Sequence, residues 1–178
     1  MAETRLTIPV LETERLTLRA PEARDFEAYC DFMTSERTVG VGGPRTRDRA
    51  FQEFCALIGH WHIRGYGRWL VADKETDEPL GVVGLMYPES WPEPEIAWSV
   101  FENAEGKGIA FEAAMRTREF AQQTLGWPRV ISCTMKDNQR SISLAERMGA
   151  IHEYDYEHPV LGKLLVWRHF NPDADSGN

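Results

Sequence analysis

Residues 95–110, EIAWSVFENAEGKGIA, place the strongest constraint on the fold. The first six residues form a strand-like pattern, a short turn follows, and Gly106 and Gly108 precede a helical stretch. Such a junction directs several backbone N–H groups to one point, with the positive end of the helix dipole behind them. Glycine also lets a bulky anion approach the backbone closely. The junction therefore predicts a diphosphate site, with Lys107 adding positive charge.

Two common diphosphate motifs do not fit this loop. A P-loop requires Ser or Thr after its lysine, where this chain has Gly108, and a dinucleotide fingerprint requires a third glycine where it has Phe111. By itself the loop is also consistent with a glycine-bearing turn before an ordinary helix.

A second motif, DNQRSISLAERMG at residues 137–149, follows one predicted strand later. Asn138 is placed to cap a helix. Ser141, Leu144, Ala145 and Met148 share one helical face, and Gly149 ends the pattern. The residues alone predict a capped amphipathic helix.

The remaining pattern predicts one order of elements along the chain. We expect a strand at 15–19, a helix from about 24, a glycine-rich loop at 39–45 and a helix at 48–62. Strands should follow at 68–72, 80–87 and 95–100, then a helix at 109–125 whose small residues allow close packing on a sheet. A strand at 130–135, a helix at 139–148 and strands at 151–156 and 164–169 complete the order. We expect a single domain at residues 1–170 and a polar acidic tail at 171–178.

Composition excludes several classes of function. The formal net charge of -8 argues against nucleic acid as a partner, because phosphate contacts need clustered Lys and Arg. The sequence shows neither a signal peptide nor an apolar run long enough for a membrane, so we expect a cytoplasmic protein. Cys30, Cys55 and Cys133 form no CxxC pair and are expected to be reduced and buried. The histidines lack ligand spacing, so we expect no metal.

The glycine loop and the later Asn-initiated helix together resemble the GNAT superfamily of N-acetyltransferases. Gly108 and Ala110 match the coenzyme A loop [Q/R]xxGx[G/A], although Glu105 replaces its first residue. Asn138, Ser141 and Gly149 match the later motif NxxSxxxxxxxG. The opening ERLTLR at 14–19 is similar to the branch that contains ribosomal-protein N-terminal (alanine/serine) acetyltransferases.

This resemblance implies an α/β fold of α+β type, the GNAT fold. Its central twisted sheet is mostly antiparallel, with six to seven strands flanked by about four helices, and it splays between the fourth and fifth strands. The implied cosubstrate is acetyl-CoA. Backbone groups of Trp98, Ser99 and Val100 should meet its pantetheine arm, and Asn138 and Ser141 should lie near the cysteamine end. The pyrophosphate should lie on the loop formed by Glu105, Gly106, Lys107, Gly108, Ile109 and Ala110.

The implied chemistry is direct aminolysis of a thioester, with Glu95 and Ser141 as the catalytic candidates. Glu95 begins the splayed strand and is our first choice of base, whereas Glu112 is better explained as a partner of the helix dipole. Many relatives place an acidic Tyr where this chain has Ala145, so Ser141, directly or through a water, is the proposed substitute. A protein base is not obligatory, since an N-terminal amine has a pKa of roughly 8.

The acceptor is expected to be a primary amine, either a protein N-terminus or a small molecule such as a polyamine or an aminoglycoside-like drug. A homodimer is implied by resemblance only. An alternative is a non-catalytic acyl-CoA sensor or assembly module, and a more remote one is a nucleotide-dependent enzyme that uses the same loop.

Overall fold

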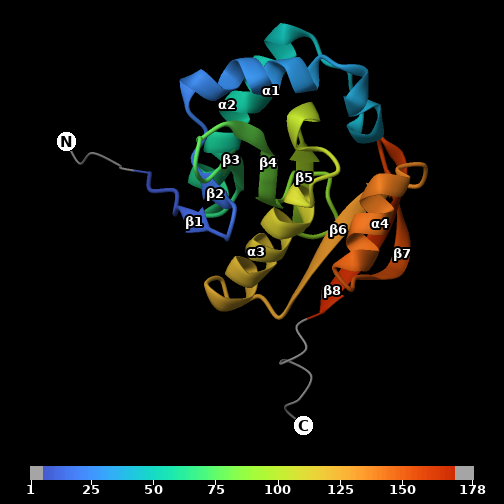
Figure 1. The fold of residues 1–178 in the computed structure, drawn as a ribbon. Helices are drawn as coiled ribbons and strands as arrows, with labels where there is room; N and C mark the ends of the chain where they lie inside the picture. Colours follow the sequence, from blue (N-terminus) through green and yellow to red (C-terminus); the bar gives the residue numbers. More distant parts are fainter. Residues whose placement is uncertain (1–5, 171–178) are drawn as a thin grey trace, which may run out of the picture.

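The computed structural model describes residues 6–170, in which an eight-stranded sheet lies between helices (Figure 1). The strand order is β1-β2-β3-β4-β5-β6-β8-β7. The strands are β1 (Leu11–Glu12), β2 (Leu16–Arg19), β3 (Arg68–Asp73), β4 (Pro79–Met86), β5 (Glu95–Val100), β6 (Arg129–Met135), β7 (Ile151–His158) and β8 (Gly162–Phe170). The α-helices are α1 (Phe26–Met33), α2 (Arg47–Arg64), α3 (Ile109–Gln123) and α4 (Gln139–Arg147). Three 3-10 helices are η1 (Ala23–Asp25), η2 (Glu36–Val41) and η3 (Glu102–Ala104).

This architecture confirms the predicted fold class and element order. Two details differ. The two-residue strand β1 raises the strand count to eight, above the six to seven expected. The segment predicted as a loop at 39–45 begins inside η2, which ends at Gly42 in the left-handed conformation. Treating residues 1–170 as one domain remains a prediction, and the tail at 171–178 lies outside the described residues.

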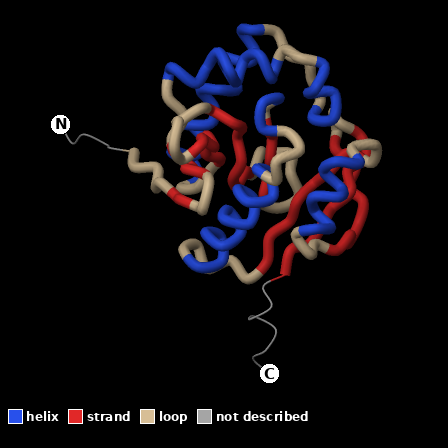
Figure 2. Tube along the Cα trace, in the orientation of Figure 1, coloured by secondary structure: helices blue, strands red, loops and turns tan. Residues whose placement is uncertain are grey.

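Side chains alternate across the sheet and form two buried layers. Helices lie on either side of the strands (Figure 2). Leu70 and Ala72 pack with α1 and α2, whereas the intervening Val71 packs in the cluster that contains α3. The predicted stripe of small residues on α3 is buried at Ala113, Ala114, Thr117 and Ala121, which lets the helix lie close to the sheet.

The sheet separates between β5 and β6, which are the fourth and fifth strands counted from β2. All other neighbouring strands are antiparallel, whereas β5 and β6 are parallel. In the described chain the two strands pair only at Glu95 and Ile131. Beyond that position the edge of β5 has no strand beside it, as Figure 1 shows by the divergence of the two ribbons.

Side chains replace the missing ladder at the point of separation. The Ser132 hydroxyl donates to the Ile96 carbonyl at 2.8 Å, and the Cys133 N–H donates to the Glu95 carboxylate at 2.7 Å. Because backbone groups alternate between the two edges of a strand, those of Trp98 face the same gap as those of Ile96. The backbone of Ser99 instead faces β4, where it pairs with Val82.

The cysteines differ in exposure. Cys30 is buried and Cys133 is half-buried, but Cys55 is exposed, so the expectation of burial was wrong for Cys55. All three are free.

Candidate functional site

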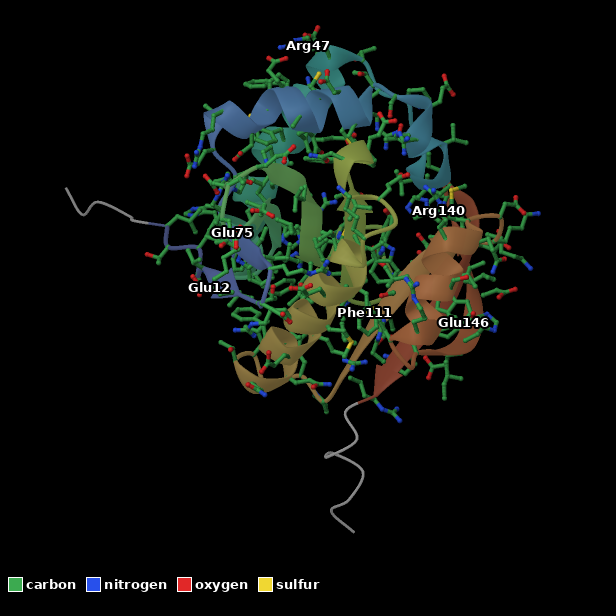
Figure 3. The ribbon with its side chains drawn as sticks, in the orientation of Figure 1. Glu12, Arg47, Glu75, Phe111, Arg140 and Glu146 are labelled. Carbon is green, nitrogen blue, oxygen red and sulfur yellow. The ribbon has the colours of Figure 1, made fainter. Side chains whose placement is uncertain are left out.

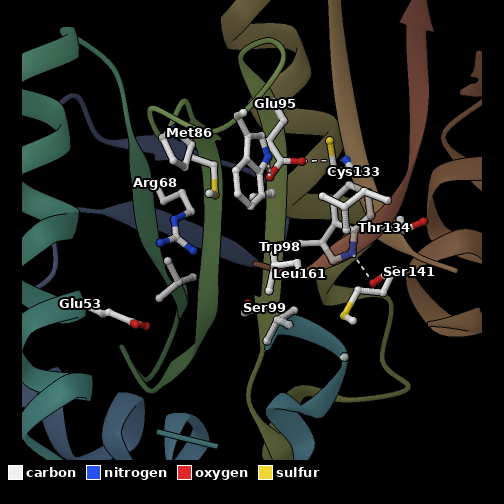
Figure 4. Close-up of a pocket in the computed structure, with 18 of the residues that line it drawn as sticks. Glu53, Arg68, Met86, Glu95, Trp98, Ser99, Cys133, Thr134, Ser141 and Leu161 are labelled. Atoms are coloured by element: carbon white, nitrogen blue, oxygen red, sulfur yellow. Dashed lines mark hydrogen bonds between the residues drawn. The ribbon is translucent and has the colours of Figure 1, made fainter. Parts of the chain in front are cut away.

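A cavity of about 620 Å³ lies where the sheet separates (Figure 4). Its walls come from α1, α2, strands β3 to β6, the start of α4 and the β7–β8 hairpin. Glu95, Trp98, Ser99, Asn138 and Ser141 all line it, so five of the predicted site residues meet in one place. The cavity lies within the size range of small-molecule sites, about 300–1,000 Å³.

Glu95 is a buried carboxylate on the cavity wall, with an exposed fraction of 4%. The Trp91 indole N–H donates to Oε1 at 2.7 Å, and the Cys133 N–H donates to Oε2 at 2.7 Å. Burial raises the pKa of Glu95 to about 7, although these two hydrogen bonds and the charge of Arg68 act in the opposite direction. The carboxylate can therefore exchange a proton near neutral pH.

The other groups in the cavity that could accept a proton are already engaged. His60 Nε2 accepts the Tyr87 N–H at 2.9 Å, so its Nδ1 carries the proton and donates to the Tyr66 carbonyl at 2.7 Å. His158 Nδ1 accepts N–H groups at residues 160 and 161, so Nε2 donates to Ser90 Oγ. Glu53 forms ion pairs with two arginines of the cavity. Among the described lining residues, Glu95 is left as the available base.

Ser141 lies on the opposite side of the gap from Glu95, in the first turn of α4. The Trp98 indole N–H donates to Ser141 Oγ at 3.2 Å (Figure 4). Asn138 caps the helix by accepting the Ser141 N–H at 3.2 Å, which confirms its predicted role as a cap. The Asn138 amide also donates to the Gly40 carbonyl at 3.3 Å, so η2 lies against the start of α4. Ala145 is fully buried one turn later, where it can supply no proton.

The glycine loop has the geometry of an anion cradle. Gly106 and Gly108 have φ angles of 72° and 77°, and Gly108 precedes α3 without a side-chain cap. The first N–H groups of a helix have no partner within it, so those at the start of α3 are available to a ligand. A Cβ on Gly106 would meet no atom within 4 Å, which indicates open space above the loop.

Side chains around this loop mainly support it. Lys107 Nζ donates to the Asn103 carbonyl at 2.7 Å, and Arg15 donates to the Lys107 carbonyl at 2.9 Å. Arg15 also pairs with Glu112, which accounts for Glu112 without a role as base. The Ile109 side chain is buried in the core, so only its backbone can face a ligand.

Glu105, the residue that departs from the family pattern, bridges two arginines. Its carboxylate lies 2.5 Å from Arg37 and 3.0 Å from Arg140, which is labelled on α4 in Figure 3. Hydrogen bonds from Arg37 and then Arg140 lower the pKa of Glu105 against the effect of burial, so it is ionised near neutral pH. These pairs join η2, the glycine loop and α4 around the mouth of the gap.

Sequence reasoning missed three contributors to the site. Trp91 bonds Glu95, Cys133 offers its backbone N–H, and Arg68 extends into the cavity (Figure 4). A guanidinium at the start of an otherwise apolar strand, as in Arg68-Trp69-Leu70, was the one signal available in the sequence.

Comparison with known proteins decides the family. The family model described as "Acetyltransferase (GNAT) domain" matches residues 15–151. The chain belongs to the GNAT acetyltransferase family. An acetyltransferase structure from Agrobacterium tumefaciens str. C58 is similar, with a TM-score of 0.86 and 36% identity, covering 96% of this chain and 99% of that one.

Two curated relatives lead to the same GNAT assignment. The uncharacterized N-acetyltransferase p20 of Bacillus licheniformis is 27% identical, over 82% of this chain and 86% of its own. The [ribosomal protein uS5]-alanine N-acetyltransferase of Escherichia coli K12 is 25% identical, over 78% of this chain and 76% of its own. GNAT acetyltransferases use acetyl-CoA, and the resemblance to the ribosomal-protein branch is confirmed at the level of relatives.

Within residues 6–170 the His, Cys, Asp and Glu side chains form no group of three or more that could hold a metal ion. None of the helices in this part of the GNAT chain combines the length and apolar character needed to cross a bilayer.

Proposed function

We propose that this protein transfers the acetyl group of acetyl-CoA to a primary amine by direct attack of the amine on the thioester. The observation that carries the proposal is the buried Glu95 carboxylate at the separation of β5 and β6, with its pKa raised to about 7. A base with a pKa near the working pH is the most effective, because it is both largely deprotonated and basic enough to accept the amine proton.

The geometry of the gap supports the binding of acetyl-CoA. The open edge of β5 offers the backbone groups of Trp98 and Val100 to the pantetheine amides, as an added strand would require. The N–H groups from Gly106 to Ala110 fit a pyrophosphate, and the first turn of α3 favours its negative charge. Ser99, whose backbone faces β4, can contribute only its side chain.

Two side chains can carry out the proton transfers of the reaction. Glu95, directly or through a water, takes a proton from the amine as its nitrogen bonds to the acetyl carbon. The carbon–sulfur bond then breaks, and the departing thiolate receives a proton through the Ser141 hydroxyl, which takes one in turn from water, or from a water that Ser141 holds. Glu95 releases its proton to solvent, so both side chains return to their starting states. Trp98 orients the Ser141 hydroxyl by donating to its oxygen, which leaves the hydroxyl proton free to point elsewhere.

Calorimetric titration with acetyl-CoA, with ATP and NAD as controls, tests the cosubstrate first. We expect selective micromolar binding, about -8 kcal/mol. Thiol release with a panel of primary amines then tests transfer. Binding without release on any amine would favour the acyl-CoA sensor, for which the buried Ala145 in place of Tyr is the supporting observation, and preference for ATP would remove both proposals.

A further inference from the structure

The cavity holds three arginines, and only two of them have a carboxylate partner. Arg45 and Arg49 lie 3.1 and 2.9 Å from the same Glu53 oxygen. Arg68 also lines the cavity, but within residues 6–170 it forms no ion pair and its guanidinium makes no hydrogen bond. The positive charge in this cavity contrasts with the chain as a whole, which carries a formal net charge of -8.

Arg68 and Glu95 lie on the same face of the sheet. Arg68 pairs with Gly84, and Glu95 pairs with Met86, which is two residues further along β4. One strand separates them, so their backbones are about 10 Å apart across the sheet. Gly84 lies opposite Arg68 and adds no side chain to the intervening strand. The Arg68 and Glu95 side chains line the same cavity of about 620 Å³, so a small ligand bound there can contact both.

A second donor in the same wall has no partner either. Tyr29 is 3% exposed and lines the cavity, and among the described residues its hydroxyl makes no hydrogen bond. Tyr29 and Arg68 line the same cavity, and the charge of Arg68 lowers the pKa of Tyr29 against the larger effect of burial. A guanidinium beside a phenol is a donor set suited to a carboxylate.

Contacts over the cavity favour a small acceptor over a long chain. A Cβ on Gly42 would lie 2.9 Å from the Leu161 side chain, and one on Gly40 would lie 2.7 Å from the Asn138 amide. The segment around η2 thus touches both the β7–β8 hairpin and the start of α4. These contacts bound two sides of the cavity, and its volume of about 620 Å³ suits a small acceptor.

We propose that the acceptor is a small primary amine that carries a carboxylate, bound through Arg68 with its amine directed toward Glu95. This inference rests on the proposed acetyl transfer and specifies its acceptor. Arginine can bind a carboxylate through two parallel hydrogen bonds, and the Arg68 guanidinium, which no side chain within residues 6–170 engages in an ion pair or hydrogen bond, is placed to receive such a ligand.

Acceptor pairs that differ only in the carboxylate test the proposal. Leucine, phenylalanine and 4-aminobutyrate are each compared with their carboxamides in kcat/KM, and binding of the acids to the protein loaded with CoA is measured by calorimetry. For at least one pair, Arg68→Gln should lower the acid-to-amide ratio of kcat/KM at least tenfold, and Arg68→Lys should restore part of it. Arg49→Gln is the matched control, because Arg49 lines the same cavity but already pairs with Glu53, and it should change the ratio less than twofold.

The outcomes separate this proposal from the transfer reaction itself. If amides are acetylated while no acid binds or reacts, the carboxylate proposal is wrong and acetyl transfer stands. If acids bind through Arg68 but no amine is acetylated, the carboxylate site stands and transfer is wrong. A pentapeptide with Glu at its second position is compared with its Gln counterpart. An Arg68 effect confined to this peptide pair would overturn the assignment to a small molecule.

Discussion

The backbone N–H of Cys133 donates to the Glu95 carboxylate at 2.7 Å, so the first side chain of β5 joins it to β6 where the two strands separate. The group proposed as base is therefore held by the feature that creates the gap. Its second oxygen is held by Trp91, which fixes the plane of the carboxylate. The protonation of the Glu95 carboxylate should therefore be visible in the pH dependence of activity.

Replacement of Glu95 by Gln should lower kcat at least about a hundredfold, the usual range for loss of a general base. The wild type should show an inflection of kcat/KM near pH 7, with activity rising as Glu95 loses its proton, and Glu95→Gln should lack it. The pH–rate profiles of both proteins check this. An unchanged inflection in the variant would assign the titration to another group.

Ser141→Ala should slow turnover about tenfold or more while the Kd for acetyl-CoA stays within about threefold, because the hydroxyl acts on the departing thiolate. Ser143→Ala, two residues further along the same helix, is the matched control. Full activity of Ser141→Ala would remove Ser141 from the mechanism.

Glu105→Gln should tighten acetyl-CoA binding several-fold. The substitution removes a negative charge from the loop and releases Arg37 and Arg140 from their ion pairs. The Arg140 guanidinium and the Nη1 side of Arg37 then become available to phosphate, while Arg37 Nη2 keeps its bond to Glu102. Calorimetry at two salt concentrations measures the effect, which should shrink as salt increases. Glu102→Gln, which removes a more exposed partner of Arg37, should change the Kd less than twofold.

Gly108→Ala should weaken acetyl-CoA binding at least tenfold, because the added methyl group would stand in the anion cradle. It should also cost about 1–2 kcal/mol of stability, since alanine is strained at a φ of 77°. Gly65→Ala is a close control: Gly65 has the same φ of 77° and ends α2 away from the loop. Equal losses of affinity in the two variants would show that strain, and not the cradle, is responsible.

His169 should make the protein sensitive to acid. Its side chain is fully buried, and burial lowers its pKa to about 3. The unfolded chain binds a proton below about pH 6.5 that the folded chain does not, so stability falls as pH falls through that range. This amounts to about 2 kcal/mol at pH 5. The raised pKa of Glu95 acts in the opposite sense over the same range.

A variant isolates the His169 contribution. His169→Gln keeps a donor for the Ser132 hydroxyl but does not titrate. Between pH 7 and pH 5 the change in the free energy of unfolding should therefore differ by about 2 kcal/mol between the two proteins, with the variant relatively more stable at pH 5 than the wild type. Parallel curves for the two proteins would contradict the assignment.

The sequence predicted the elements that have strong local signals. The helix at α3 followed from its small residues and from Gly108, and the cap at Asn138 followed from its position before a periodic stretch. The two-residue β1 is too short to show alternation. The glycines at 40, 42 and 43 concealed the 3-10 turn of η2.

The site was predictable only in part, for a physical reason. Glu95 and Ser141 carry recognisable chemistry near motifs, but the partners that tune them come from distant segments. The Cys133 N–H that bonds Glu95 and the Arg68 charge that lowers its pKa are placed by the strand order, which no local pattern reveals. Likewise, the ion pairs of Glu105 depend on tertiary contacts between η2 and α4.

The divergence of β5 and β6 has a consequence for folding as well as for catalysis. Among the described residues, β5 and β6 meet through one register pair, two hydrogen bonds that involve side chains, and a long backbone bond from Ile131 to Pro94. A pantetheine arm bound in the gap between β5 and β6 would supply hydrogen bonds that are missing between the two halves of the sheet. The cosubstrate would then stabilise the folded protein, and the melting temperature would rise with its concentration.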